Sequence, residues 1–154
     1  MQVSIRAVTR EDEQRWRSLW EGYNVFYKRT VSEEVTANTF SRFLDDKVQL
    51  YCAVAVAETP DAASAQVIGF VTWFPHFSTA AVEPVVYLND LFVDPDQRLH
   101  GVGGKLIEHV YKHSKEVIGA QSVYWHTQHF NHRAQLLYVK KGNKTDFVQY
   151  EKSF

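Results

Sequence analysis

The stretch DLFVDPDQRLHGVGGKLI, residues 90–107, decides the fold expected for this chain. Its apolar start is typical of a β-strand, and its end is typical of an amphipathic helix. Between them, a glycine-rich turn brings successive backbone N–H groups to the start of the helix, an arrangement that binds anions. Glycine lets such a backbone close around a phosphate with no Cβ in the way. The sequence therefore predicts a phosphate-binding turn made by Arg98, Leu99, His100, Gly101, Val102, Gly103, Gly104 and Lys105.

Known phosphate-binding patterns match this turn to different degrees. A P-loop requires G-x-x-x-x-G-K-[ST], but Leu99 replaces its first glycine and Leu106 replaces its Ser or Thr. A dinucleotide-binding fingerprint requires a third glycine, and Leu106 stands at that position too. Arg98, Gly101 and Gly103 do match Arg/Gln-x-x-Gly-x-Gly/Ala, and the segment resembles the pyrophosphate-binding turn of the GNAT acyltransferases. A tight loop that only caps a helix remains an alternative for this segment alone.

A second segment, residues 131–142, supports the same resemblance. Asn131 is a good helix N-cap and Gly142 a good residue to follow a helix, so one helix is expected between them. Ala134 and Tyr138 lie four residues apart and therefore share a face, where the small side chain leaves room beside the ring. The segment resembles the second GNAT signature, Asn-x-x-Ala-x-x-x-Tyr-x-x-x-Gly. Taken alone, it also fits an ordinary core helix with a buried tyrosine.

The two segments occur in the order that the GNAT family requires, with a strand between them, and the resemblance covers nearly the whole chain. It is strongest to small fungal enzymes that acetylate histones, polyamines and D-amino acids. The resemblance implies acetyl-CoA as donor and direct transfer of the acetyl group to a primary amine in a ternary complex. It also implies an α/β fold with a mixed central sheet of about six to seven strands and about four flanking helices.

The bulk properties set the remaining limits. A length of 154 residues fits one domain over residues 1–154, and a net charge of −1 gives no field that favours nucleic acid. Cys52 has no partner for an internal disulfide, which fits a reducing compartment. No signal peptide or membrane span is visible, so a cytoplasmic location is expected, with the nucleus as an addition. The histidines at 109 and 113 and at 126, 129 and 132 lack Cys or Glu partners, so no metal site is expected.

Periodicity and turn residues predict the elements along the chain. A helix is expected to start at Thr9, which has an acid three residues later. Expected helices cover residues 9–28, a segment after residue 32, 103–118 and 131–141. Expected strands cover residues 3–8, 49–58, 67–74, 85–93, 122–127 and 147–150.

The family resemblance assigns roles at the donor site. The strand over residues 85–93 is expected to separate from its neighbour at a bulge, so that Leu91, Phe92 and Val93 contact the pantetheine arm. A backbone N–H there would polarise the acetyl oxygen. Asn131 resembles the family residue that binds pantetheine, and it can cap the helix as well. Tyr138 is expected to contact the cofactor and to act as general acid, because its pKa of about 10 lies near the value of about 8.5 for a thiol.

The acceptor site is less determined. Trp16, Trp20, Tyr23 and Tyr27 share one helix face, which fits core packing first and an acceptor pocket second. Asn89 occupies the position where many relatives carry Glu, and Asn cannot accept a proton. Asp90 is expected on the opposite face of a regular strand. The base is therefore open: a water relayed to Asp90, Tyr87 or a histidine, or an amine that arrives unprotonated.

Three further expectations concern activity and assembly. The preferred acceptor is a small primary amine or amino acid, with basic peptide tails second. The missing Glu leaves a non-catalytic acyl-CoA sensor as the alternative function. Residues 147–154 alternate poorly between polar and apolar, so neither face buries cleanly, and the related fungal enzymes associate through this region. A two-fold homodimer is expected, or a tetramer, with an edge strand on a monomer as the alternative.

Overall fold

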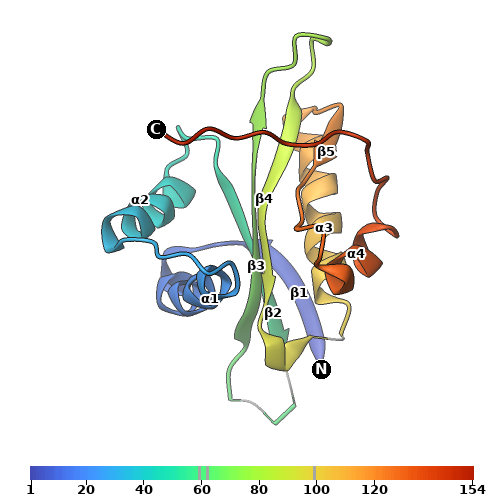
Figure 1. Ribbon diagram of the computed structural model, residues 1–154. Coiled ribbons are helices and arrows are strands. Elements are labelled where there is room, and N and C mark those ends of the chain that lie inside the picture. Colours follow the sequence, from blue (N-terminus) through green and yellow to red (C-terminus); the bar gives the residue numbers. More distant parts are fainter. Residues whose placement is uncertain (59, 62, 99) are drawn as a thin grey trace.

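A mixed β-sheet forms the centre of the molecule (Figure 1). The computed structural model describes residues 1–58, 60–61, 63–98 and 100–154. The strands follow the chain in spatial order: β1 (Gln2–Ala7), β2 (Tyr51–Glu58), β3 (Gln66–His76), β4 (Val85–Val93) and β5 (Ser122–Tyr124). The first four pair antiparallel, and β5 pairs parallel to β4. The mixed sheet agrees with the fold class implied by the resemblance.

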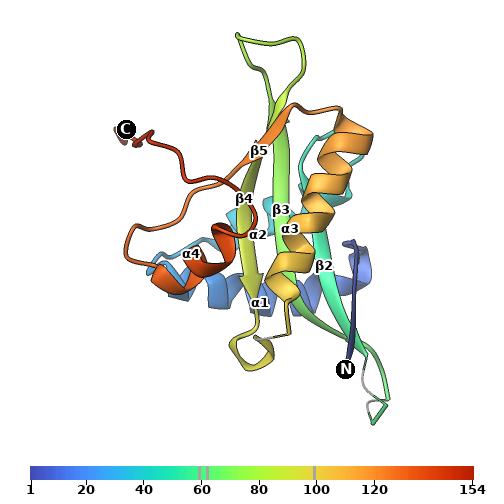
Figure 2. The same ribbon diagram turned by 90° about the vertical axis from the view of Figure 1, so that its right-hand side faces the viewer.

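Helices cover both faces of this sheet (Figures 1 and 2). On one face lie α1 (Glu13–Phe26) and α2 (Glu33–Leu44), and on the other lie α3 (Val102–His113) and α4 (His132–Tyr138). A π-helical turn, Ser114–Ile118, continues α3, and 3₁₀ turns cover Arg10–Asp12 and Pro95–Gln97. Within the described ranges, no helix combines the length and the apolar character needed to span a membrane.

Strand β2 separates the two halves of the core. Its alternate side chains point to opposite faces, as a regular strand requires. Cys52, Val54 and Val56 pack with the side chains of α1 and α2. The alanines at 53, 55 and 57 pack with α3 instead. Since alanine is small, α3 lies close to the sheet, and its Leu106 is fully buried there.

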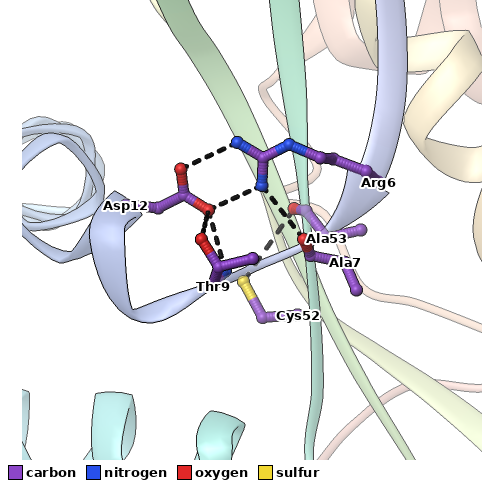
Figure 3. Close-up of polar contacts among 6 residues, drawn as sticks. All are labelled: Arg6, Ala7, Thr9, Asp12, Cys52 and Ala53. Atoms are coloured by element: carbon purple, nitrogen blue, oxygen red, sulfur yellow. Dashed lines mark hydrogen bonds and ion pairs between the residues drawn. The ribbon is translucent and has the colours of Figure 1, made fainter.

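The start of α1 is fixed by a polar cluster that connects it to β1 (Figure 3). Asp12 accepts hydrogen bonds from Arg6 through Nη1 at 2.7 Å and Nη2 at 2.9 Å, and from the backbone N–H of Thr9 at 2.8 Å. The predicted helix start at Thr9 is confirmed, and Asp12 is the acid that completes its capping box. The Arg6 guanidinium is the main reason that the pKa of Asp12 lies below its ordinary value.

The sheet differs from the expectation in two respects. Among the described residues it has five strands, rather than six to seven, and residues 147–154 form neither strand nor helix. The predicted final strand is wrong because this segment runs away from the sheet after α4 and meets no strand edge (Figure 2). Strand β5 ends at Tyr124 rather than 127, because its pairing with β4 stops there.

Candidate active site

Strands β4 and β5 separate after the first third of β4, and a separation within this strand was expected from the family resemblance. Their pairing covers only Val85 with Ser122, Val86 with Val123, and Tyr87 with Tyr124. From residue 88 to 93, this edge of β4 has no strand partner within the part of the chain that the structure describes. We call this opening the β4–β5 fork. An unpaired strand edge can accept an extended ligand arm as an additional strand.

A β-bulge at Asn89 adjoins the fork. Thr72 of β3 lies opposite Asp90, but the next residue, Trp73, lies opposite Leu88, so Asn89 is an extra residue in β4. As a result, Leu88 packs in the core on the α3 side and Phe92 in the core on the α1 side. The bulge itself was expected from the family resemblance.

Asn89 and Asp90 do not lie on opposite faces, so that expectation is wrong. The Nδ2 group of Asn89 donates a hydrogen bond to Oδ1 of Asp90 at 3.3 Å. The regular alternation on which the expectation relied is broken by the bulge. Asp90 consequently turns toward α1, where it is buried.

The carboxyl group of Asp90 is enclosed by hydroxyl groups. The Thr72 hydroxyl donates to Oδ2 of Asp90, and the Tyr23 hydroxyl, 3.5 Å from the Asn89 carbonyl oxygen, faces the same region. Burial raises the pKa of Asp90 above its ordinary value, and the hydrogen bonds from Thr72 and Tyr23 offset this only in part. The site thus holds a buried carboxyl group next to the fork, a feature that is common where proton transfer occurs.

The aromatic row of α1 divides into two parts. Trp16 and Trp20 lie in the core, with 0% and 8% of their surfaces exposed, and Nε1 of Trp20 donates to Oγ1 of Thr36 at 3.0 Å. Core packing therefore accounts for these two residues. Tyr23 continues the row, and its ring centroid lies 4.9 Å from that of the half-buried Tyr27. Only this end of the row reaches the neighbourhood of Asp90.

Arg29 is a site residue that the sequence did not single out. It follows Lys28, whose φ of 55° turns the chain sharply after α1. The guanidinium carbon lies 5.4, 5.3 and 5.9 Å from the ring centroids of Trp20, Tyr23 and Tyr27. The available signal was an arginine two residues after the last aromatic residue of the row. Residue types alone do not predict the turn that folds this arginine back over the row.

Tyr138 lies at the end of α4, with its ring centroid 5.6 Å from that of Trp125. Burial, with the nearby phenol of Tyr27 as the smaller cause, raises the pKa of Tyr138 to about 12. The hydroxyl therefore stays protonated at neutral pH, as a proton donor must. The structure brings Tyr138, at the end of α4, close to Tyr27, which follows α1.

The glycine-rich turn leads into α3 as expected. Gly101 caps the helix with a φ of 69°, a left-handed conformation that favours glycine, and the helix begins at Val102. The first backbone N–H groups of a helix have no partner within it and can bind an anion. Gly103 has a further role, because a Cβ there would lie 3.1 Å from Cδ2 of Leu137 in α4. Leu99 lies outside the described residues.

Cations surround this turn. Nε of Arg98 donates to the Val93 carbonyl oxygen at 3.3 Å, and its guanidinium lies 5.8 Å from the Phe92 ring. Burial lowers the pKa of Arg98, and Arg133 of α4 lowers it further. Arg133 was not singled out from the sequence. His100 and Lys105 are exposed beside them. The turn therefore combines helix N–H groups with the positive side chains of Arg98, Lys105 and Arg133.

Asn131 caps α4, as predicted. Its Oδ1 accepts a hydrogen bond from the backbone N–H of Ala134 at 3.2 Å. Its contact with pantetheine stays a prediction, as do the contacts expected of Leu91, Phe92 and Val93. The helix is shorter than expected, since it ends at Tyr138 and continues as a turn to Gly142. A Cβ on Gly142 would lie 2.9 Å from Cη2 of Trp125, so glycine permits this close approach.

Two of the candidate proton-accepting side chains meet where the fork begins. The Tyr87 hydroxyl and Nδ1 of His126 lie 3.2 Å apart. The sequence left the base open to a histidine without saying which one, and named His126 only as a member of a possible metal set. Within the described ranges, no three side chains of the types His, Cys, Asp or Glu come together as a metal site would require.

Comparison with known proteins gives consistent matches. A family model described as the acetyltransferase (GNAT) family matches residues 14–142. The D-amino-acid N-acetyltransferase HPA3 of Saccharomyces cerevisiae is 45% identical over 152 residues, which cover 98% of this chain and 91% of that protein. The N-acetyltransferase YhfO of Bacillus subtilis is 29% identical over 150 residues, with 96% and 95% of the two chains covered.

Solved structures with low sequence identity share the fold. The crystal structure of a probable acetyltransferase has a TM-score of 0.81 and 24% identity, covering 100% of this chain and 98% of that one. The structure of AAC(6')-Iy in complex with a CoA-containing bisubstrate analog has a TM-score of 0.79 and 21% identity, and the match covers 100% of this chain and 99% of that one.

Proposed function

This chain belongs to the acetyltransferase (GNAT) family and is an acetyl-CoA-dependent N-acetyltransferase, and on that premise we propose that its acceptor is the amino group of a small amino acid. The observation that carries the proposal is the 45% identity, over 98% of the chain, to a protein named as a D-amino-acid N-acetyltransferase. D-amino acids are accordingly the first acceptors to test, ahead of other small amines and basic peptide tails.

The proposed donor site follows the fork and the turn. Acetyl-CoA supplies an acetyl group activated as a thioester. The N–H groups at the start of α3, with Arg98, bind its phosphates, and the free edge of β4 from residue 88 to 93 pairs with its extended arm. A backbone N–H on this edge then polarises the carbonyl group as the amine attacks it.

The reaction requires two proton transfers, one to the leaving sulfur and one from the attacking amine. Tyr138, which remains protonated at neutral pH, donates its proton to the sulfur that leaves. The amine gives up its proton through water to one of two places: the buried Asp90 behind the bulge, or the Tyr87–His126 pair where the fork begins. The attack is direct, so the scheme needs no covalent enzyme intermediate.

The test is an acceptor screen that measures thiol release from acetyl-CoA. The panel contains D-amino acids, their L enantiomers, a polyamine and a histone-tail peptide, and mass spectrometry identifies each product. We expect the highest kcat/KM with free amino acids, and the D forms ahead of the L forms. Useful rates with histone tails or polyamines alone would contradict the proposed acceptor.

One observation favours a second function. Asn89 lies at the bulge and cannot accept a proton, so the chain could bind acyl-CoA as a sensor without transferring the acyl group. Isothermal titration separates the two functions. A sensor would bind acetyl-CoA with no amine-dependent thiol release, whereas failure to bind at millimolar concentration would contradict both.

We also propose that two copies associate through residues 147–154. Phe147, Val148 and Tyr150 are 87%, 77% and 92% exposed in the single chain. Apolar side chains left in water by one chain are a common sign of an interface. A two-fold homodimer is the simplest assembly that covers them, with a tetramer as its extension.

A further inference from the structure

Arg29 is held in place by one of its nitrogens and leaves the others unused. Nε donates to Oδ1 of Asn24 at 2.6 Å, and the backbone N–H of Arg29 donates to the Asn24 carbonyl oxygen at 3.1 Å. Asn24 is itself buried, so this anchor is rigid. In the part of the chain that the structure describes, the two terminal nitrogens of Arg29 make no hydrogen bond or ion pair. These two terminal nitrogens can bind the two oxygens of a carboxylate through a pair of parallel hydrogen bonds.

The surroundings of Arg29 suit a bound anion. Three aromatic rings, those of Trp20, Tyr23 and Tyr27, lie within 6 Å of the guanidinium and exclude water from one side of it. An ion pair formed against such a low-polarity surface is stronger than the same pair in bulk water. In addition, stacking against the rings limits the freedom that the side chain would lose on binding.

The charges beyond Arg29 are opposite in sign. Asp90 lies close enough that the Arg29 guanidinium lowers its pKa, although burial outweighs this effect. Tyr27 lies close to Arg29, and it is also near enough to Tyr138 to affect the pKa of that phenol. A molecule with an anionic group at Arg29 and an amino group toward the Asp90 carboxyl therefore matches the polarity of the site. A polyamine would instead place a cation against a cation.

We propose that the guanidinium of Arg29 binds the carboxylate of the amino-acid acceptor and so directs its amino group toward the β4–β5 fork. This inference rests on the proposed function, since it assumes an amino acid as acceptor. It also predicts that the site distinguishes enantiomers. With the amine and the carboxylate both held, the side chains of the D and L forms point to different parts of the site.

The experiment compares an acid with its amide. The best D-amino acid of the acceptor screen and its carboxamide differ in the negative charge but hardly in size. Because the amide also has a less basic amine, the quantity compared between variants is the acid-to-amide ratio of kcat/KM. The variants are Arg29→Met, which keeps the length of the side chain, and Arg29→Lys, which keeps the charge but loses the planar guanidinium group.

We expect Arg29→Met to lower kcat/KM for the acid by roughly 10- to 100-fold, the usual effect of losing charge-assisted hydrogen bonds. The same variant should leave kcat/KM for the amide within about threefold of the wild-type value. It should also lower the preference for the D enantiomer and leave the acetyl-CoA affinity measured by titration unchanged. For Arg29→Lys, we expect a kcat/KM for the acid between those of the wild type and Arg29→Met. Lys28→Gln is the matched control, because it removes the same charge from the same turn and should leave the acid-to-amide ratio unchanged.

Several outcomes would overturn this inference. Equal losses for acid and amide would show that Arg29 only positions Tyr23 and Tyr27. Unchanged kcat/KM values for both the acid and the amide would show that the carboxylate binds elsewhere. Neither result touches the proposed function, which depends on the wild-type protein acetylating free amino acids. If the wild type acetylates amides and simple amines but no free amino acid, the proposed function and the role of Arg29 both fail.

Discussion

A single extra residue in β4 turns a carboxyl group toward α1. Asn89 forms the bulge. As a result, Asp90 lies on the α1 side of the sheet beside Thr72 and Tyr23, whereas Leu88 lies on the α3 side. Because burial raises the pKa of Asp90, this group adds stability below its ordinary pKa and loses that contribution as the pH rises through its folded value. Ionised Asp90 is therefore a cost to the fold at higher pH, of the kind often found at functional sites.

Tyr138 allows a direct test of the proposed general acid. Tyr138→Phe removes only the hydroxyl, so we expect kcat to fall roughly 100-fold or more. Acetyl-CoA affinity should stay within a few-fold, because the ring packed against Trp125 remains. Steady-state kinetics and isothermal titration measure the two quantities. An unchanged kcat would exclude Tyr138 as the acid.

Asp12 should make stability depend on pH. Its pKa is lowered by Arg6, so the folded state gains stability from the ionised form above the ordinary pKa, and this gain disappears as the pH falls. We expect Asp12→Asn to lower the free energy of unfolding by about 1–2 kcal/mol at pH 7, since its partner Arg6 is partly exposed. In urea unfolding, the difference from wild type should shrink as the pH falls from 5 to 2.5. A constant difference would contradict this account of the ion pair.

At the scale of elements, the α3 segment carries a glycine with positive φ at each end. Gly101 precedes Val102 with a φ of 69°, and Gly119 follows the π-helical turn with a φ of 73°. A Cβ on either residue would have no neighbour within 4 Å. An alanine at either position would therefore be destabilising only because of its left-handed backbone conformation. The two positions thus form a matched pair, one at the proposed phosphate site and one far from it.

Alanine at these two glycines should separate stability from binding. We expect Gly101→Ala and Gly119→Ala each to lower the free energy of unfolding by about 1–2 kcal/mol, the cost of a left-handed conformation for a residue with a Cβ. Only Gly101→Ala should also weaken acetyl-CoA binding, because it distorts the turn that presents the N–H groups. Chemical denaturation and titration test this. Equal acetyl-CoA affinity in both variants would place the phosphates elsewhere.

At the scale of the whole molecule, the sheet and its helices bury two separate sets of side chains, but the end of the chain joins neither. Residues 147–154 leave the sheet after α4 (Figure 2), and Phe154 is fully exposed. One copy of the chain therefore lacks a surface that covers these aromatic groups. A second copy would supply it.

Removing residues 147–154 should change the assembly. We expect the full chain to be a dimer or larger by light scattering at micromolar concentration, and the shortened chain to be a monomer. The core lies in the two clusters on the faces of the sheet, which exclude this segment, so the shortened chain should keep its fold by circular dichroism. A full chain that is monomeric with and without acetyl-CoA would refute the dimer.

Local sequence patterns determined most of the elements. Thr9 with Asp12, Ser32 before α2, and Asn131 before α4 each mark a helix start through a hydrogen bond to a residue only three positions away. The apolar run of β4 likewise predicted its full length. Such features depend on near neighbours in the chain, which is why residue types and their spacing were enough to find them, together with the glycine turn. The fork was expected only because the family resemblance implies it.

Contacts between distant parts of the chain decided the rest. The face that Asp90 occupies depends on the register between β3 and β4, and the position of Arg29 depends on how the turn after α1 folds back over the aromatic row. The predicted strand at residues 147–150 failed for the same reason, because a strand requires an edge to pair with and alternation alone cannot supply one. Residue spacing determined most of the elements and the glycine-rich turn, whereas only the tertiary structure, through register and packing, determined where Asp90 and Arg29 lie.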